Sequence, residues 1–488
     1  MLPQKCLANV AAARAFSGEK SAPMTGFKAQ SLNEVSKAIS LEPLDPGDDR
    51  YTDLSKARGT RDLLKLRQHL ENAADHEQCA CAAFVGHRGS GKSTELKRLE
   101  GQLADRFTAL HLEIDKSLQD DCDYTDLFLW LVDCVVSFFA KEKLDLDAGK
   151  ASAVADWFAE RTIETADALK KEIELETTAE VSAKAGTNLW FFAYAAKLLA
   201  RLKARVVGNR EHRTVARLKL QNWSDDLLRR VNEVLADARA VLEKSGRPRR
   251  LLIVHDNLDR MRPEPALRLF RDNGDLLKQI EADCVWTVPI NSRLAPFGIH
   301  TVFNHVFSMP TIKVHDRTGA DVPTGIDGLV ALVGRRMEIG LVFDSPEVVA
   351  YLAKMSGGSV RDLLRLVGEA QLAAQIDGLS AIDQASAEDA VKKVRIDFQR
   401  TLMPSDAYYP LLAAVFGTKE DAFLSGSVSP EQAASNRTFF SDLLVNGSVL
   451  EYNGDANWFD VHPVILDIEA FRNACQAPKA KKPRRKKA

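Results

Sequence analysis

A glycine-rich segment of eight residues has the composition and spacing of a phosphate-binding loop. Residues 86–93 are Gly-His-Arg-Gly-Ser-Gly-Lys-Ser and fit the pattern G-x-x-x-x-G-K-[ST] at every fixed position. Glycines let backbone N–H groups curl around phosphates, and the following helix presents its positive end. We expect Lys92 to reach the β- and γ-phosphates of ATP and the Ser93 hydroxyl to bind Mg²⁺. The predicted nucleotide contacts in this segment are Gly86, His87, Arg88, Gly89, Ser90, Gly91, Lys92, Ser93 and Thr94.

A second candidate is an apolar run that ends in aspartate, within the sequence Leu-Leu-Ile-Val-His-Asp-Asn-Leu-Asp-Arg at residues 251–260. An Asp at the carboxyl end of a buried strand is typical of the Walker B motif, so we expect Asp256 to hold Mg²⁺. Many ATPases place Glu next to polarise the attacking water, but this chain has Asn257, which cannot accept a proton. Either Asp259 acts as the base, or hydrolysis is slow and the protein is a nucleotide switch. The alternative for Asp259 is an ion pair with Arg260 or Arg262.

Both motifs need a parallel sheet to bring them together, and the sequence predicts one. Apolar runs at residues 81–85, 107–114, 249–254, 283–290 and 305–314 predict five strands. Helical spacing at residues 61–74, 92–103 and 124–141 alternates with these strands. The predicted fold class is therefore α/β, with a parallel five-stranded P-loop sheet.

The rest of the chain divides into further predicted units. Residues 1–43 lack periodicity and predict a disordered leader, and residues 145–245 predict a helical insertion within an ATPase domain at 44–320. Four helical segments at 326–337, 346–355, 360–376 and 387–402 predict a helical lid domain at 321–403. Two helices followed by a hairpin with an Asn-Gly turn predict a winged-helix-like domain at 404–472. A basic disordered tail is expected at 473–488.

At this point the chain resembles known ATPases. The run Asp-Asn-Leu-Asp-Arg at residues 256–260 resembles the second motif of STAND and KAP-type P-loop ATPases. The run Ser-Gly-Gly-Ser-Val-Arg at residues 356–361 is similar to the start of a lid helix in the replication-initiator clade of AAA+ proteins. That resemblance implies that Arg361 touches the γ-phosphate, with a sharp turn at the two preceding glycines. The alternative is a capped helix with a surface arginine.

The resemblance also implies sensor residues at the end of the fourth strand. Thr287 or Asn291 is expected to hydrogen-bond the γ-phosphate or the attacking water, and Arg293 resembles the arginine that ends the STAND sensor motif or acts on a neighbouring subunit. Tyr51 or Arg58 is the candidate for packing on the adenine. A group of bacterial ATPases is similar in carrying D-P-x-x-x-x-Y, G-H-R-G-x-G-K-S-T-E-L, D-N-L-D-R and T-V-P, all present here.

Charge is distributed unevenly along the chain. The net charge is −2, but residues 478–488 carry seven positive and no negative side chains, so the remainder carries −9. The candidate recognition helix at 430–446 offers only Arg437 against Glu431 and Asp442, and the hairpin adds Glu451, Asp455 and Asp460. This pattern favours a protein contact or an autoinhibitory role for the winged helix over DNA binding. The basic tail is either a solubilising segment or a sequence-independent nucleic-acid contact.

Composition narrows the remaining classes. Seven cysteines at scattered positions match no disulfide or zinc framework, and no apolar run reaches the length of a membrane helix, so we expect a cytoplasmic protein with reduced thiols and no membrane contact. The leading hypothesis is an ATP- and Mg²⁺-dependent switch that controls homo-oligomerisation or binding of a protein partner through the insertion or winged helix, in signalling or anti-phage (antiviral) defence. The alternatives are a DNA-binding initiator or loader, and a nucleotide-stabilised scaffold without significant turnover.

Overall fold

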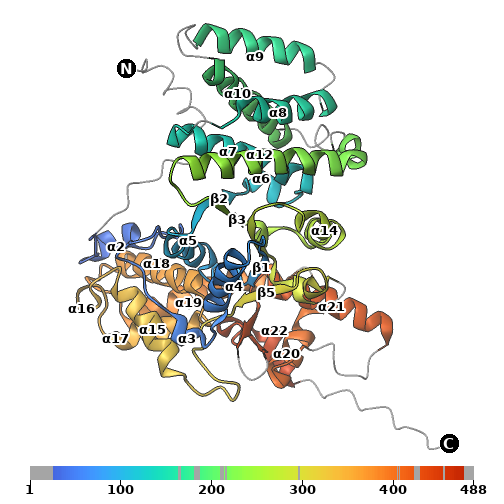
Figure 1. The fold of residues 1–488 in the computed structure, drawn as a ribbon. Helices are drawn as coiled ribbons and strands as arrows, with labels where there is room; N and C mark the ends of the chain where they lie inside the picture. The colour runs from blue at the N-terminus through green and yellow to red at the C-terminus, as the bar shows by residue number, and fades with distance from the viewer. Residues whose placement is uncertain are drawn as a thin grey trace, which may run out of the picture.

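The computed structural model describes residues 26–144, 146–162, 166–180, 187–208, 214, 217–294, 297–403, 405, 407–421, 429–453 and 457–476. Residues 1–25 of the predicted leader and 477–488 of the predicted tail lie outside this part of the chain. The elements form three tiers, with helices of the insertion at one end, the sheet in the middle, and the lid and C-terminal domain at the other end (Figure 1).

The central sheet is parallel throughout and has five strands in the order β2-β3-β4-β1-β5. The predicted α/β fold class is therefore confirmed. The strands are β1 (Cys81–Gly86), β2 (Phe107–Glu113), β3 (Arg250–Asp256), β4 (Asp283–Val288) and β5 (His305–Met309). β1 lies between the middle strand β4 and the edge strand β5, so the loop that follows it leaves the carboxyl edge with a strand on either side.

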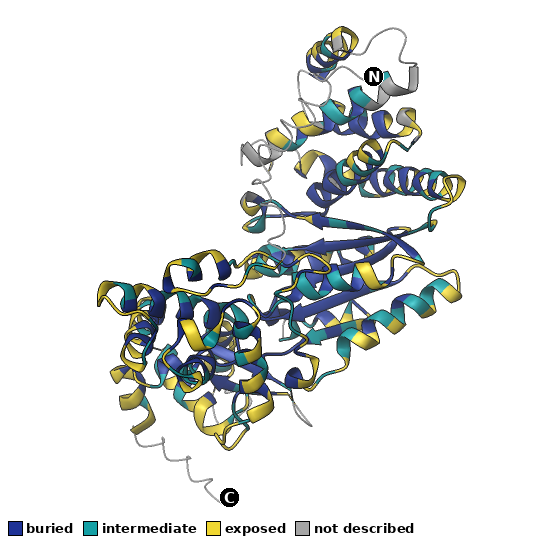
Figure 2. Ribbon diagram, turned by 90° about the vertical axis from the view of Figure 1, so that its left-hand side faces the viewer, coloured by how far each residue is buried: buried dark blue, intermediate teal, exposed yellow. Residues whose placement is uncertain are grey.

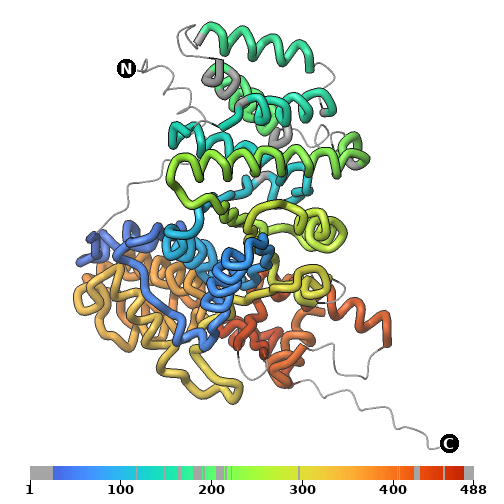
Figure 3. Tube along the Cα trace, in the orientation of Figure 1, coloured from blue at the N-terminus to red at the C-terminus, as the bar shows by residue number. Residues whose placement is uncertain are grey.

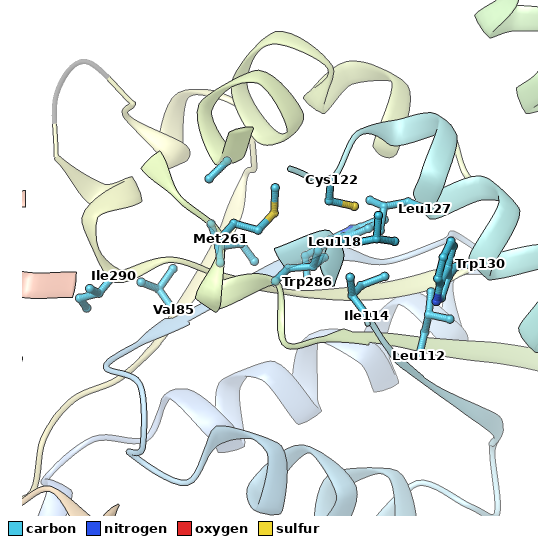
Figure 4. Packing of buried hydrophobic residues seen from close by; sticks show 14 of the residues in the cluster. Val85, Leu112, Ile114, Leu118, Cys122, Leu127, Trp130, Met261, Trp286 and Ile290 are labelled. Atoms are coloured by element: carbon cyan, nitrogen blue, oxygen red, sulfur yellow. The ribbon is translucent and has the colours of Figure 1, made fainter. Parts of the chain in front are cut away.

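Side chains alternate between two faces of the sheet, as the period of a strand requires. Ala82 and Phe84 of β1 pack with the helices α4 (Asp62–Asp75) and α5 (Lys92–Gln102) on one face. Ala83 and Val85 belong to the larger core on the other face. Figure 4 shows part of that core around Trp286, with apolar side chains from the helices directed onto the sheet. Both faces are covered, and the strands are almost wholly buried (Figure 2).

The insertion predicted at residues 145–245 is helical and lies between β2 and β3 in the chain. It consists of α8 (Ala148–Thr162), α9 (Ala166–Glu180), α10 (Thr187–Gly208), η2 (Gln221–Trp223) and α12 (Ser224–Lys244), preceded by α6 (Lys116–Gln119) and α7 (Tyr124–Glu142). α7 begins at a capping box, in which the Asp126 carboxylate accepts from the Asp123 N–H at 2.9 Å. α7 and α12 lie next to the sheet, and α9 is the outermost helix (Figure 1).

Short helices fill the connections from β3 to β4 and from β4 to β5. They are η3 (Leu258–Arg260), α13 (Pro263–Leu267), η4 (Arg268–Asp272), α14 (Gly274–Leu277), η5 (Ile290–Arg293) and η6 (Ile299–Thr301). The lid comprises α15 (Pro323–Gly334), α16 (Ile339–Val342), α17 (Pro346–Met355), α18 (Val360–Ile376) and α19 (Gln384–Leu402). Its four longer helices are those that the sequence predicts. α18 begins where the Ser359 hydroxyl accepts from the Asp362 N–H, which satisfies one free donor of the first turn.

The C-terminal domain contains α20 (Tyr408–Thr418), α21 (Pro430–Val445), the antiparallel hairpin β6 (Val449–Tyr452) and β7 (Trp458–Val461), η8 (Pro463–Ile465) and α22 (Glu469–Gln476). The predicted hairpin is confirmed. α22 extends the ordered structure into residues 473–476, which were expected to belong to a disordered tail.

Residues 26–43 are also ordered, so the prediction of a disordered leader over 1–43 is wrong for this part. α2 (Leu32–Ala38) buries Leu32, Val35 and Ala38 and packs on α18 of the lid. The helix is only two turns long, so its three apolar positions produce a weak periodic signal. α3 (Ser55–Arg58) follows before the sheet begins. Figure 3 shows the start of the described chain running beside the lid before it enters the sheet.

Among the described helices, none combines the length and apolarity that crossing a lipid bilayer requires. The six cysteines in the described residues are free thiols.

Candidate functional site

The loop between β1 and α5 is built around glycines with left-handed backbone. Gly89 and Gly91 have φ values of 84° and 97°, a conformation that a side chain would strain. A Cβ at Gly86 would lie 2.6 Å from the carbonyl oxygen of Met309 on β5. These positions admit only glycine, and they direct the loop backbone around the amino end of α5.

Lys92, the first residue of α5, is 4% exposed and turned back over the loop. Its Nζ donates to the carbonyl oxygens of Gly86 and His87, both at 2.8 Å, and lies 2.7 Å from the Asp259 carboxylate. The alternative drawn from the sequence was an ion pair of Asp259 with Arg260 or Arg262. In the structure Asp259 pairs with Lys92. The Asp259 carboxylate is the negative group that neutralises the loop lysine in this structure.

The Walker B aspartate lies at the end of β3, next to the first turn of α5. Asp256 accepts from the Asn257 N–H at 2.7 Å and from His111 Nε2 at 3.4 Å, and its side chain is hydrogen-bonded to that of Ser93. Burial raises the pKa of Asp256, but the hydrogen bonds from His111 and Ser93 outweigh it and lower the pKa to about 2. The carboxylate is thus charged and adjacent to a hydroxyl, as a Mg²⁺ site needs.

The described residues hold no cluster of three or more His, Cys, Asp or Glu side chains suited to a metal ion. Mg²⁺ is usually held by few protein groups, with phosphate oxygens and water as its other ligands. The Asp256 carboxylate and the Ser93 hydroxyl fit a site of that kind. His111 is a residue that sequence reasoning missed. It lies on β2, and its Nδ1 is 2.6 Å from Glu100 of α5. The one sequence feature that could have revealed His111 is the alternation of side chains along β2, which places His111 on the face of the sheet that α5 covers.

The predicted sensor residues after β4 are bound to protein groups. The buried Thr287 hydroxyl donates to the carbonyl of His255 at 3.1 Å and accepts from the Leu258 N–H at 3.2 Å, so it fixes the turn after β3. Asn291 Nδ2 donates to Ser441 of α21 at 2.8 Å, and its buried Oδ1 has no hydrogen-bond partner among the described residues. These contacts hold the loop after β4 against β3 and the C-terminal domain.

Arg293, the last of these residues, contacts the hairpin. Its Nη1 donates to Glu451 of β6 at 2.6 Å. The Glu451 carboxylate is buried and also accepts from Asn457 at 2.5 Å. Asp460 of β7 is likewise buried, and it pairs with Lys419 at 2.6 Å. The charge argument made from the sequence is therefore wrong for these two carboxylates, since neither faces solvent.

Arg361 lies against the phosphate loop, where the resemblance to a lid arginine places it. Its backbone N–H donates to the Gly89 carbonyl at 3.3 Å, and a Cβ at Gly89 would lie 2.6 Å from the Arg361 Cβ. Burial lowers the pKa of its guanidinium, and the nearby cations Arg88 and Arg260 lower it further. Gathering cations in a partly buried place is unfavourable unless an anion offsets it, which is typical of a site for phosphate.

His87 joins the loop to the hairpin. Its Nε2 accepts from the backbone N–H of Glu451 at 2.8 Å, and its ring is also hydrogen-bonded to the backbone of Leu444. Burial and the nearby charge of Lys92 lower the pKa of His87 to about 3. The imidazole is therefore neutral, and both of its nitrogens are used in holding the C-terminal domain. His87 was predicted as a nucleotide contact, and its side chain is instead hydrogen-bonded to the C-terminal domain.

Arg58 supports the same loop from α3. Its side chain is buried and donates to the carbonyls of Ser90 at 2.6 Å and Pro310 at 2.8 Å. Burial lowers the pKa of Arg58 to about 10. Both donor groups are thus committed to the backbone, so the alternative that Arg58 packs on the adenine is not what this structure shows.

Tyr51 lies beside the opposite end of the loop. Its hydroxyl is bonded to Glu95 and Arg98 of α5, and the Arg98 guanidinium lies 4.3 Å from the ring centre. Thr94 Oγ1 accepts from the Leu44 N–H at 3.1 Å. A cavity of about 440 Å³ is lined by Leu44, Tyr51 and Thr94 together with other residues of the 44–51 segment, α5 and the lid. Its position next to Thr94 suits a nucleotide base.

A second cavity, of about 310 Å³, lies where the loop meets the lid and the C-terminal domain. His87 and Arg88 of the loop, Arg361 of the lid and Asn446 of the C-terminal domain are among its lining residues. Three units of the chain thus converge on one end of the phosphate loop. The parallel sheet, the glycine loop with its lysine and the aspartate at the end of β3 together define the P-loop nucleoside triphosphatase fold.

Comparison with known proteins gives fold-level likenesses. No protein-family model matches the chain. No curated protein sequence matches it. Among solved structures, a Walker-type ATPase of Pyrococcus abyssi aligns at 11% identity and a TM-score of 0.42, over 89% of this chain and 99% of that one.

Two further solved structures align over most of the chain. Cdc6p from Pyrobaculum aerophilum aligns at 12% identity and a TM-score of 0.36, over 90% of this chain and 97% of its own. Orc1 of Aeropyrum pernix, solved in complex with DNA, aligns at 13% identity and a TM-score of 0.35, over 90% and 95%. Each of the three spans nearly the whole of its own chain in the alignment.

Proposed function

We propose that the protein is an ATP-binding, slowly hydrolysing ATPase of the AAA+/STAND kind that acts as a nucleotide-controlled switch. The observation that carries this proposal is the contact of Arg361 with Gly89. The first turn of the lid helix α18 lies directly on the phosphate loop, so a rearrangement of the loop around phosphate displaces the lid. The cavity beside Thr94 would receive the base and the amino end of α5 the phosphates.

The residues divide the chemistry among them. Lys92 would bind the β- and γ-phosphates, and Arg361 would stabilise the charge that develops on the γ-phosphate. Ser93 and Asp256 would hold Mg²⁺, which neutralises phosphate charge when bound. Asn257 stands where a general base is common, and Asp259 is engaged by Lys92. Slow turnover is part of the proposal because Asn257 cannot accept a proton and Asp259 must first leave Lys92 before it could activate water.

The partners and setting of the switch are also proposals. A homo-oligomer whose assembly depends on ATP, with a protein partner on the insertion or the winged-helix-like C-terminal domain, suits the architecture. Arg293 would then act within its own chain, because Glu451 holds it. A cytoplasmic role in signalling or anti-phage defence is consistent with this design.

The test uses wild type, Lys92→Ala and, as a control, Lys65→Ala, whose ammonium is exposed on α4. Mass photometry is run without nucleotide, with ATP and with a non-hydrolysable analogue, and phosphate release is measured on the same samples. We expect assembly of wild type and Lys65→Ala only with nucleotide, and turnover at least about 100-fold lower in Lys92→Ala. Equal turnover in wild type and Lys92→Ala would exclude the ATPase. Turnover without assembly would exclude the oligomeric switch.

A second candidate function is ATP-dependent handling of nucleic acid. The seven positive charges of residues 478–488 support it. Fluorescence anisotropy with duplex and single-stranded DNA at moderate salt tests it on the full chain and on a chain ending at residue 477. Binding that needs the tail but not ATP would assign the affinity to the tail alone. ATP-dependent binding that survives removal of the tail would favour an initiator or loader.

A further inference from the structure

The hairpin strand β6 contacts four separate segments. Three of them leave strands at the carboxyl edge of the sheet, and the fourth is a turn of the lid. The Glu451 N–H donates to His87 in the loop after β1, and its carboxylate holds Arg293 in the loop after β4. Its carbonyl accepts from the Thr311 N–H after β5 at 3.0 Å. One residue of the C-terminal domain is therefore bonded to all three segments that leave β1, β4 and β5.

The next residue of β6 extends the contact to the lid. The buried Tyr452 hydroxyl donates to the Gly357 carbonyl at 2.6 Å, in the turn that precedes α18. Gly357 has a φ of 60°, and a Cβ there would lie 2.5 Å from Leu450 Cδ1. The absence of a side chain at Gly357 thus lets the hairpin approach the lid turn closely.

Ligands of open α/β sheets bind outside the carboxyl ends of the strands, so the gap between the β1 and β4 loops is where a nucleotide alters the backbone. β1 and β4 are neighbours in the sheet. Glu451 is bonded to the loop after β1 and to the loop after β4, so its position must change when the distance between these two loops changes. It must also resist that change, because coupling between two sites is reciprocal.

We propose that Glu451 is a positioning residue of the nucleotide site, through which the C-terminal hairpin and the occupant of the phosphate loop are coupled. The backbone of Glu451 fixes His87, whose carbonyl accepts from Lys92, and its carboxylate fixes Arg293. The hairpin is thereby a wall of the site, and binding of ATP is transmitted to α20–α22 through the loops after β1 and β4 as well as through the lid. This inference rests on the proposed function, since it requires ATP at the loop.

Hydrogen exchange of the full chain tests the coupling at residues 449–453 and 457–461, with and without ATP. The variants are Glu451→Gln, which keeps the size of the side chain, and Arg293→Gln, which removes the same ion pair from the loop side. The control is Glu420→Gln, which removes an exposed ion pair at 3.0 Å between the C-terminal domain and Arg317 of the segment after β5. A thermal melt of each variant checks that it folds, and Arg293→Gln serves if Glu451→Gln does not.

We expect ATP to change exchange of the hairpin in wild type and in Glu420→Gln, and to change it much less in both ion-pair variants. A double-mutant cycle on the Kd for ATP should be non-additive by at least about threefold, because the two side chains touch. Hairpin exchange that ignores ATP in wild type, or an additive cycle, would overturn the coupling. If wild type did not bind ATP, or if Lys92→Ala did not weaken that binding, the proposed function would be overturned instead. The two failures are therefore distinguishable.

Discussion

The two ends of this molecule differ in how they are joined to the phosphate loop. At one end, the lid and the C-terminal domain bond directly to loop residues, through Arg361 to Gly89 and through Glu451 to His87. At the other end, α8, α9 and α10 of the insertion pack mainly on one another and on α7 and α12 (Figure 1). The difference indicates that changes at the loop reach the lid and C-terminal domain first, and that the outer insertion is a separate module.

The largest expected effect on ATP binding is at the turn that places the lid. Gly358 has a φ of 88°, and a Cβ there would lie 1.8 Å from the Ile312 carbonyl oxygen. Gly358→Ala should cost at least about 2 kcal/mol of stability and weaken ATP binding, because the turn carrying Arg361 must shift. Thermal unfolding and a binding titration measure both. Gly319→Ala is the control, since Gly319 has a φ of 90° but open space around it; equal losses in the two variants would refute a steric origin.

An intermediate effect is expected at Asp259, which bonds Lys92 at 2.7 Å. Asp259→Asn removes the carboxylate that competes with phosphate for Lys92, so the Kd for ATP should fall about fivefold, equivalent to about 1 kcal/mol. Equilibrium binding of a fluorescent ATP analogue measures this, and phosphate release is followed in parallel. An unchanged Kd with turnover lowered about 100-fold would show instead that Asp259 is the general base.

The smallest effect on nucleotide handling is expected in the insertion. Leu198 of α10 is wholly buried against its neighbouring helices. Leu198→Ala should destabilise the outer helices by about 2–5 kcal/mol and raise their hydrogen exchange, while KM for ATP changes less than about twofold. The matched variant is Leu364→Ala in α18, also buried, where KM should rise because the lid contact is affected. A rise in KM for Leu198→Ala as large as that for Leu364→Ala would remove the contrast between the two ends.

The part of the site that is local in sequence could be predicted, and the part that depends on distant segments could not. The glycine loop, Lys92 and Asp256 follow from motifs of a few residues, whereas the position of Arg361 against the loop was implied by the resemblance to the lid helix of known ATPases. The strands were recognisable because each is an apolar run flanked by polar turns. The order β2-β3-β4-β1-β5 was not predicted, because it depends on which of those runs lie side by side.

The missed contacts join residues far apart in the chain. His87 and Glu451 are separated by 364 positions, and Arg58 and Pro310 by 252. No periodicity or motif links such pairs, because they are set by how whole domains dock. The carboxylates of the hairpin were expected on the surface, but Glu451 is buried where the hairpin meets Arg293 of the loop after β4, and Asp460 is buried beside Lys419 of its own domain. Thr287 or Asn291 was expected to hydrogen-bond the γ-phosphate or the attacking water; in the structure the Thr287 hydroxyl is hydrogen-bonded to the backbone of His255 in β3 and of Leu258 in η3.

Helix α2 and the short segment that follows it limit how far the lid can move. Ala29 pairs with Met337, and α2 packs on α18, so this helix moves with the lid although it precedes the sheet. Six residues beyond its last residue, Ala38, the Leu44 N–H is bonded to Thr94 on α5. Six residues of extended chain span at most about 20 Å. A wider excursion of the lid must first pull Leu44 away from Thr94, so the reach of the lid is limited by a bond beside the phosphate loop itself.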